Sequence, residues 1–214
     1  MGIIIWPHQN KTVVFKNEQG NSIYRKNNYT NKKAVSNVIH DITRTRENER
    51  QKRDLLYYGA IGCGCMIPAD DMIQEFLYVQ NAYGIEARKG KRMYHEIFSL
   101  LDEEVRGLYY NPYYLYEFAL ECARWYYDQG FQVVFAIHYQ SKFHIHFAVN
   151  SINFRTGLKF HTSKKEKTKR EQLFNWILQK HIMMRSAPMV PVMFSNGYTN
   201  AFSCLCDCNL GKTM

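Results

Sequence analysis

Two histidines in the segment 143–150 are separated by one residue within a run of alternating apolar and polar side chains. The run reads Phe-His-Ile-His-Phe-Ala-Val-Asn, with His144 and His146 at alternate positions. Side chains of a β-strand point alternately to opposite faces, so both imidazoles share a face and the bulky apolar residues share the other. The pattern predicts a strand with one core face and one face that carries chemistry.

A third histidine lies in the preceding stretch and is expected to join the other two across a hairpin. His138 follows a run of alternating apolar residues and falls on the face that they leave free. A turn centred on Ser141 sets His138 opposite His144 and Ala136 opposite His146, within roughly 5 Å across the strands. Small alanines on this face leave room for an ion and a ligand.

Three neutral imidazoles can bind a divalent ion of borderline softness and leave coordination positions open. Water or a phosphate oxygen can fill those positions, which is typical of a catalytic centre rather than a closed structural site. A single strand histidine is more often packed or solvated than bound to metal. Three on one face of one hairpin favour a metal site formed by His138, His144 and His146.

The surrounding elements predict an α+β fold with a central, mainly antiparallel β-sheet and helices packed on it. Strands are expected near 2–6, 12–15, 22–24 and 92–99, and helices over 32–46, 70–82, 112–129 and 164–184. Asn111 and Pro112 favour a helix start, and Gly130 favours its end. The order of helix, glycine and hairpin is typical of helices stacked on one face of an antiparallel sheet.

Length and composition favour one domain. The chain has 214 residues, of which 46% are hydrophobic, and this is enough for one core. We assign residues 1–185 to that domain and 186–214 to a peripheral tail. Neither a run of roughly 18 to 20 apolar residues nor a signal peptide is evident, which predicts a cytoplasmic protein without membrane insertion. The six cysteines are expected to be reduced thiols, and the run Cys204–Cys208 lacks the usual zinc spacing.

The charge balance suits a polyanionic partner. Lysine and arginine outnumber aspartate and glutamate by 28 to 19, giving a formal net charge of +9 and a pI near 9.2. The candidate DNA contacts are Arg44, Arg46, Lys164, Lys165, Lys167, Lys169 and Arg170. A charge run such as 164–170 is more often a solvated helix face, and a DNA-gripping arm is the alternative beside a metal site.

The segment from His138 to His161 resembles the third motif of relaxases, the mobilisation nucleases of conjugative plasmids and integrative elements. It reads His-Tyr-Gln-Ser-Lys-Phe-His-Ile-His-Phe-Ala-Val-Asn as far as Asn150, and Asn-Phe-Arg-Thr-Gly follows at 153–157. The resemblance extends upstream through 90–99 and 37–46 in the family's order.

This resemblance implies a three-histidine (HUH-type) metal site on an antiparallel sheet, and nicking of DNA at an origin of transfer. The ion is expected to be Mn²⁺ or Mg²⁺. Relaxases attack a phosphodiester with a side chain, normally a tyrosine on an early helix, and stay joined to the 5′ end. The implied partners are single-stranded DNA at an origin of transfer and other relaxosome and coupling proteins. Relaxases commonly continue into further regions, so this chain is expected to be a truncated one.

The expected nucleophile is absent from its position. The family pattern has a tyrosine before Ile-Thr-Arg-Thr-Arg, whereas here Asp41 precedes residues 42–46. A carboxylate is a poor substitute, because it would form an acyl phosphate that water readily destroys. His40 can act as a covalent nucleophile in principle, and the displaced tyrosine candidates are Tyr29, Tyr57 and Tyr58. If none of them serves, the chain is a degenerate relaxase that binds metal and single-stranded DNA without nicking.

Four further residues bear on the site. Asn150 shares the histidine face and either orients a histidine or contacts DNA, or is simply a polar residue at the end of the strand. His95 and Glu96 point to opposite faces of their strand, and His95 is expected to face the site. Gln140 stands where many relaxases have an acidic residue, which predicts weaker metal binding. A replication-initiator or transposase nuclease is a third alternative, and the lack of tyrosine in 164–184 counts against it.

Overall fold

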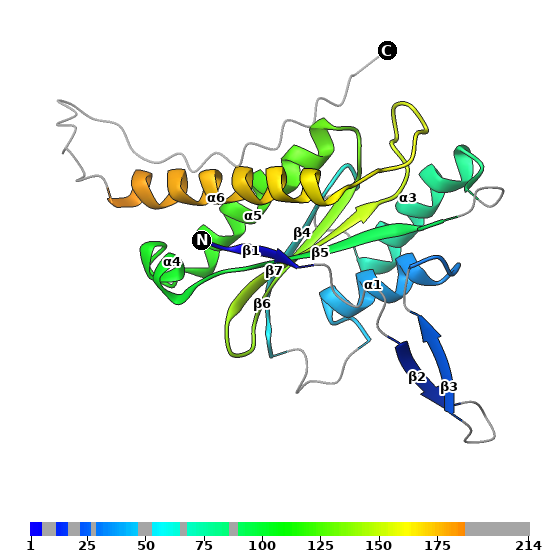
Figure 1. Cartoon of the computed structure of the whole chain (residues 1–214), viewed down its shortest axis with the longest axis horizontal. Helices are drawn as coiled ribbons and strands as arrows, with labels where there is room; N and C mark the ends of the chain where they lie inside the picture. Colours follow the sequence, from blue (N-terminus) through cyan, green and yellow to red (C-terminus); the bar gives the residue numbers. More distant parts are fainter. Residues whose placement is uncertain are drawn as a thin grey trace, which may run out of the picture.

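A computed structural model of the chain describes residues 1–5, 12–16, 22–26, 29–46, 53–64, 68–85 and 90–186 (Figure 1). Its strands are β1 (Ile3–Ile5), β2 (Thr12–Lys16), β3 (Ser22–Lys26), β4 (Leu55–Ile61), β5 (Met93–Ser99), β6 (Val133–Tyr139) and β7 (Phe143–Asn150). Its helices are α1 (Ala34–Thr43), α3 (Ala69–Ala82), α4 (Asp102–Gly107), α5 (Pro112–Asp128) and α6 (Lys164–Ser186). The predicted tail beyond Ser186, with its cysteine run, lies outside the described residues.

The central sheet has five strands in the order β1-β5-β7-β6-β4, and each neighbouring pair is antiparallel. β2 and β3 pair separately as a hairpin. The α+β prediction is therefore confirmed. The β6–β7 hairpin lies inside the sheet, between β5 and β4, so its strands are held by hydrogen bonds on both sides. A rigid interior hairpin is a good platform for side chains that must keep a fixed geometry.

Helices cover both faces of the sheet, and the prediction that they stack on one face was wrong. α4, α5 and α6 pack on the face that carries Phe135, Ile137 and Phe147. α1 and α3 pack on the opposite face, over Ala136 and Ala148 (Figure 1). The small alanines of the second face are apolar enough to accept a helix close to the sheet. None of the described helices is both long and apolar enough to cross a membrane.

α5 has the boundaries and the buried face that the sequence predicted. The Asn111 side chain accepts a hydrogen bond from the Tyr113 backbone N–H, and Pro112 occupies the first turn. Leu115, Phe118, Ala119, Cys122 and Tyr126 form a stripe along the helix and are fully buried. This helix covers the apolar face of the hairpin and leaves the other face to α1.

Gly59, the first residue of the glycine-rich stretch 59–64, lies within β4. Gly59 pairs with Phe135 of β6. A β-carbon at Gly59 would lie 2.7 Å from the Phe135 ring and 3.1 Å from the Tyr116 hydroxyl oxygen. The glycine is therefore explained by close packing on the sheet rather than by a turn.

Glu96 and Arg170 form a buried ion pair between β5 and α6. The Arg170 Nε–H donates to a Glu96 carboxylate oxygen at 2.9 Å, Arg170 Nη2 binds the other oxygen, and the Tyr126 hydroxyl donates to Glu96 at 2.6 Å. Both charged side chains are at most 2% exposed. The prediction that Arg170 contacts DNA is wrong, because its guanidinium fixes α6 to the sheet.

Candidate metal centre

The register of β6 and β7 brings the three predicted histidines together. His138 pairs with His144, and Ala136 pairs with His146, as the alternation predicted. One ring nitrogen from each of the three histidines lies within 4.8 Å of the others. The ring centroids of His138 and His146 are 4.5 Å apart, and those of His144 and His146 are 5.0 Å apart. This spacing suits three ligands of one ion.

Hydrogen bonds fix which ring nitrogen of His138 and of His144 faces the group. His138 Nε2 lies 2.7 Å from the Ile42 carbonyl oxygen, so Nε2 carries the proton and Nδ1 has the lone pair. His144 Nδ1 lies 3.0 Å from the Lys142 carbonyl oxygen, which leaves the lone pair on Nε2. Donation of the second ring N–H to a carbonyl is the usual support of a metal-binding histidine.

His146 has the same arrangement, with another histidine as its partner. Its Nδ1 lies 2.8 Å from His95 Nε2, and its own Nε2 is buried without a hydrogen-bond partner. A buried nitrogen without a partner is costly unless something binds it. If His146 Nδ1 donates to His95, the Nε2 lone pair points into the group, where a divalent ion would satisfy it. The three residues therefore fit such an ion.

Burial favours the neutral imidazoles that metal binding requires. It lowers the pKa of His138 to about 4. It also lowers the pKa of His146 well below its usual value, and the neighbouring His95 acts in the same direction. His138 and His146 are therefore neutral at neutral pH, so no proton has to be removed from them before an ion binds.

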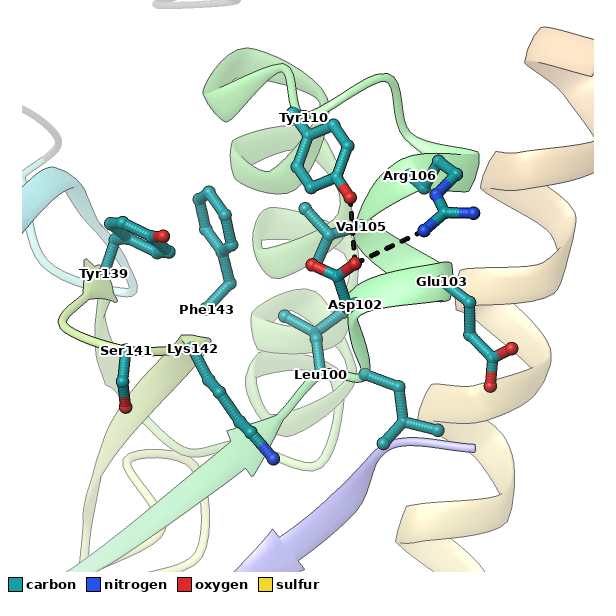
Figure 2. Close-up of a pocket in the computed structure, with 11 residues that line it drawn as sticks. Leu100, Asp102, Glu103, Val105, Arg106, Tyr110, Tyr139, Ser141, Lys142 and Phe143 are labelled. Atoms are coloured by element: carbon teal, nitrogen blue, oxygen red, sulfur yellow. Dashed lines mark hydrogen bonds and ion pairs between the residues drawn. The ribbon is translucent and has the colours of Figure 1, made fainter.

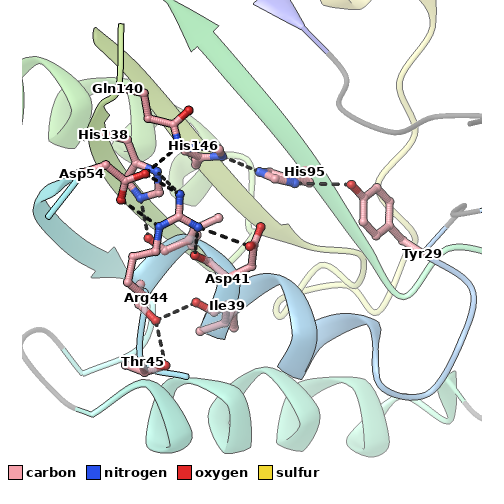
Figure 3. Close-up of polar contacts among 12 residues, drawn as sticks. Tyr29, Ile39, Asp41, Arg44, Thr45, Asp54, His95, His138, Gln140 and His146 are labelled. Carbon is pink, nitrogen blue, oxygen red and sulfur yellow. Dashed lines mark hydrogen bonds and ion pairs between the residues drawn. The ribbon is translucent and has the colours of Figure 1, made fainter. Parts of the chain in front are cut away.

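Arg44 and Asp54 form a charged pair beside His138 that sequence reasoning missed. Arg44 binds the Asp54 carboxylate at 2.9 and 2.8 Å through two nitrogens, and its Nη2 also lies 3.2 Å from His138 Nδ1 (Figure 3). Burial raises the pKa of Asp54, but the hydrogen bonds from Arg44 and Gln140 outweigh it and hold that pKa below its usual value. The carboxylate that Gln140 lacks is thus supplied from the chain before β4. The motif in the sequence could not reveal the role of Asp54, since this residue lies outside the motif.

His95 and Tyr29 extend the hydrogen-bonded chain away from His146. The Tyr29 hydroxyl oxygen lies 3.4 Å from His95 Nδ1, and both side chains are buried (Figure 3). Burial raises the pKa of Tyr29 to about 12, and the charge of Asp41 adds to the effect. The sequence correctly predicted that His95 rather than Glu96 is on the histidine face. Tyr29 is separated from His146 by the His95 ring, which suits a positioning role rather than attack on a bound phosphate.

His95→Phe is expected to weaken Mn²⁺ binding by roughly 10- to 100-fold, because His146 loses the acceptor that holds its ring. Tyr29→Phe removes only a hydroxyl that lies beyond His95, so the loss of Mn²⁺ affinity should be smaller. Isothermal titration of the purified variants with Mn²⁺ measures both. His95→Gln retains an acceptor and should recover part of the affinity, whereas equal affinity in His95→Phe and wild type would argue against this positioning role.

His40, Tyr57 and Tyr58 each contact groups other than the three histidines. His40 points toward α3, with Nδ1 2.6 Å from the Thr45 hydroxyl and Nε2 3.2 Å from an Asp70 oxygen. Tyr57 packs on Tyr116 of α5, on the opposite face of the sheet. Tyr58 pairs with Ala136 on the histidine face, but α1 packs over that alanine.

Asp41 is the predicted residue on α1 that lies beside the group. Its carboxylate accepts from Arg44 Nη1 at 3.3 Å, and its side chain is 58% exposed. Since Arg44 also contacts His138, one guanidinium connects Asp41 to the candidate metal ligands. Asp41 is thus open to solvent at the edge of the site.

Asn150 does not contact a histidine in the structure. It is fully buried, accepts from Gln80, and donates to the Phe76 carbonyl and to Gln132. Of the two interpretations of Asn150, the structure matches the polar residue at a strand end. Its position near the end of β7, four residues beyond His146, makes it part of the connection between α3 and the sheet.

The predicted basic residues divide between the two faces of the sheet. Arg44 and Arg46 lie at the end of α1, where Arg46 is exposed and donates to Ser36. α6 packs on the opposite face from the histidines. Its first turns carry the exposed or partly exposed side chains of Lys164, Lys165, Lys167 and Lys169.

A pocket of about 660 Å³ lies at the turn that joins the two histidine strands (Figure 2). Its wall includes the rings of Tyr139, Phe143 and Tyr110, together with Lys142 and Asp102. The Asp102 carboxylate is held by the Tyr110 hydroxyl at 3.0 Å. The Lys142 backbone belongs to both sites, because its carbonyl also orients His144.

Comparisons with known proteins relate the chain to a family of relaxase nuclease domains. A family model described as "Relaxase: MobA/VirD2-like, nuclease domain" matches residues 9–183, which is more than half of the chain. No curated protein sequence matches. A solved structure reported under "Molecular Basis of Vancomycin Resistance Transfer in Staphylococcus aureus" is 14% identical to this chain. That similarity covers 62% of this chain and 72% of the other, with a TM-score of 0.44.

Proposed function

This chain belongs to the family of MobA/VirD2-like relaxase nuclease domains, and on that premise we propose that it is a mobilisation nuclease that nicks single-stranded DNA at an origin of transfer. The activity depends on a divalent ion, Mn²⁺ or Mg²⁺, at His138, His144 and His146. The observation that carries the proposal is the convergence of three imidazole nitrogens, each supported on its other side by an acceptor or a histidine.

When bound, the ion would hold non-bridging oxygens of the scissile phosphate and offset the charge that develops in the transition state. The protein itself contributes by holding the reacting groups in position. The hairpin fixes the three ligands, and the Ile42 and Lys142 carbonyls hold two of the rings. α1 brings Asp41 and Arg44 to the edge of the same site.

Two kinds of protein surface could bind the rest of the DNA strand. Arg46 and the lysines at the start of α6 provide positive charge for the backbone. The pocket at the hairpin turn presents the rings of Tyr139 and Phe143, on which a base would stack (Figure 2). The DNA strand would thus contact one side of the hairpin turn, and the ion would lie on its other side.

A second candidate function is DNA and metal binding without nicking. Asp41 favours it, since this residue stands where the family pattern has a tyrosine nucleophile. The metal ligands are intact in both cases, so metal binding alone does not separate the two functions.

A cleavage assay separates them. The purified protein is incubated with Mn²⁺ and single-stranded oligonucleotides, including origin-like sequence from beside its gene, and products are read on denaturing gels. Nicking at one position, lost when the ion is chelated, is the expected result. Binding should weaken steeply with added salt, as phosphate contacts do. Binding without any cleavage would favour the second candidate, and absence of both would oppose the two together.

A further inference from the structure

A carboxylate occupies the edge of the candidate metal centre, on the helix that would otherwise present the nucleophile. Asp41 lies on α1 between the Arg44 guanidinium and the buried Tyr29–His95 pair (Figure 3). Its side chain is the exposed member of this group, at 58%, so water reaches it freely. The neighbouring carboxylate of Asp54 is only 14% exposed and is already bound by Arg44 and Gln140.

Among the described residues, three of the four candidate side-chain nucleophiles are held by other groups, and the fourth, Tyr58, pairs with Ala136, over which α1 packs. His40 has its nitrogens against Thr45 and Asp70, Tyr57 lies on the other face, and Tyr29 is behind the His95 ring. Water beside Asp41 is the nucleophile that requires no rearrangement of these residues. A positioned carboxylate that accepts a proton from attacking water is general-base catalysis.

We propose that this domain cleaves DNA by hydrolysis, with Asp41 as the general base for a water molecule, and so releases its product instead of remaining joined to it. The inference rests on the proposed nuclease function and changes its chemical class from strand transfer to hydrolysis. The substrate remains a phosphodiester of single-stranded DNA.

The step balances without a redox partner. The water oxygen forms a bond to phosphorus, one water proton passes to the Asp41 carboxylate, and the bond between phosphorus and the 3′ oxygen breaks. The 3′ oxygen leaves as a hydroxyl after it takes a proton from solvent, and Asp41 returns its own proton to solvent. The products are a free 5′-phosphate and a free 3′-hydroxyl.

Arg44 makes the carboxylate compatible with a phosphate. A bare Asp41 would repel the DNA backbone, and the guanidinium 3.3 Å away, which Asp41 shares with Asp54, reduces that repulsion. The same guanidinium lies 3.2 Å from His138 Nδ1, the nitrogen that would bind the ion, so Arg44 would have to release this atom when the ion binds. Asp41 is a catalytic residue in this scheme, and Arg44 is a positioning residue.

The decisive experiment is a single-turnover cleavage in ¹⁸O-labelled water with Mn²⁺, followed by mass spectrometry of both DNA and protein. Hydrolysis gives a free 5′-phosphate that carries one ¹⁸O, with no protein–DNA adduct. A stable adduct would overturn the proposal, because it requires a side-chain nucleophile. Cleavage in the presence of hydroxylamine tests attack by Asp41 itself, since a hydroxamate at Asp41 would reveal an acyl phosphate and would also overturn the general-base role.

A binding measurement tests the position of Asp41 without turnover. Asp41→Asn removes one negative charge beside the bound phosphate and should tighten binding of a single-stranded oligonucleotide several-fold in fluorescence anisotropy. Asp71→Asn is the matched control, because Asp71 is an exposed aspartate on α3 away from the histidines. Equal effects of the two changes would contradict the placement of Asp41 at the phosphate.

Asp41→Tyr distinguishes failure of this inference from failure of the proposed function. The exposed position should accept a tyrosine without loss of folding. If wild type does not cleave but Asp41→Tyr forms a covalent adduct, the hydrolytic role is overturned while the metal and DNA site is retained. If neither protein cleaves DNA that both bind, the proposed nicking function fails together with the inference.

Discussion

His146→Ala is expected to abolish measurable Mn²⁺ binding and, with it, nicking. The Nε2 atom of His146 is buried within the three-histidine group and has no other partner, so its loss leaves two imidazoles for the ion. The loss of affinity should exceed the roughly 10- to 100-fold that is typical of changes to residues around the ligands. Isothermal titration with Mn²⁺ measures the binding, and the oligonucleotide assay measures the nicking.

His161→Ala is the matched control for this change. His161 follows the hairpin in sequence, but its side chain is 88% exposed and lies outside the three-histidine group. The control should bind Mn²⁺ as wild type does. Mn²⁺ binding of wild-type strength in His146→Ala would place the ion elsewhere and would remove the main support for the proposed function.

Arg170→Leu is expected to lower the free energy of unfolding by about 3–5 kcal/mol, the usual cost of leaving one partner of a buried ion pair without the other. The Glu96 carboxylate, which is 1% exposed, would lose the Arg170 guanidinium that balances its charge. Chemical denaturation followed by circular dichroism gives the free energy. Metal affinity of the folded fraction should be retained, because α6 packs on the face opposite the histidines.

Two variants control this measurement. Lys169→Leu changes the exposed neighbour in the same helix and should alter stability by much less. Glu96→Leu combined with Arg170→Leu removes both charges and should be more stable than Arg170→Leu alone. A single Arg170→Leu variant as stable as Lys169→Leu would show that the pair contributes little to holding α6.

The sequence alone determined the local arrangement of the three histidines. A period of two assigns each strand residue to a face, and a short turn sets the register, so His138, His144 and His146 had to converge if the hairpin formed. The same period of two placed the His95 and Glu96 side chains on opposite faces of their strand. Capping residues and glycine likewise fixed the ends of α5, because these effects depend on neighbours in the chain.

Only the tertiary structure decided which groups support those histidines. The Ile42 carbonyl that orients His138 lies 96 residues earlier in the chain, and the Arg44–Asp54 pair also comes from outside the hairpin. Periodicity gives the direction of a side chain but not its partner across the core. The buried partners of Arg170 and Asn150 were not predicted for this reason.

The two-sided covering of the sheet was also decided by packing. Ala136 and Ala148 were interpreted as space around an ion, yet both are fully buried beneath α1 and α3. Small side chains permit either an open site or a closely packed helix, and the sequence does not distinguish them. The position of α1 settled the question, and it placed Asp41 and Arg44 beside His138. The sequence therefore determined the candidate metal ligands, whereas the packing of one helix determined the residues that lie next to them.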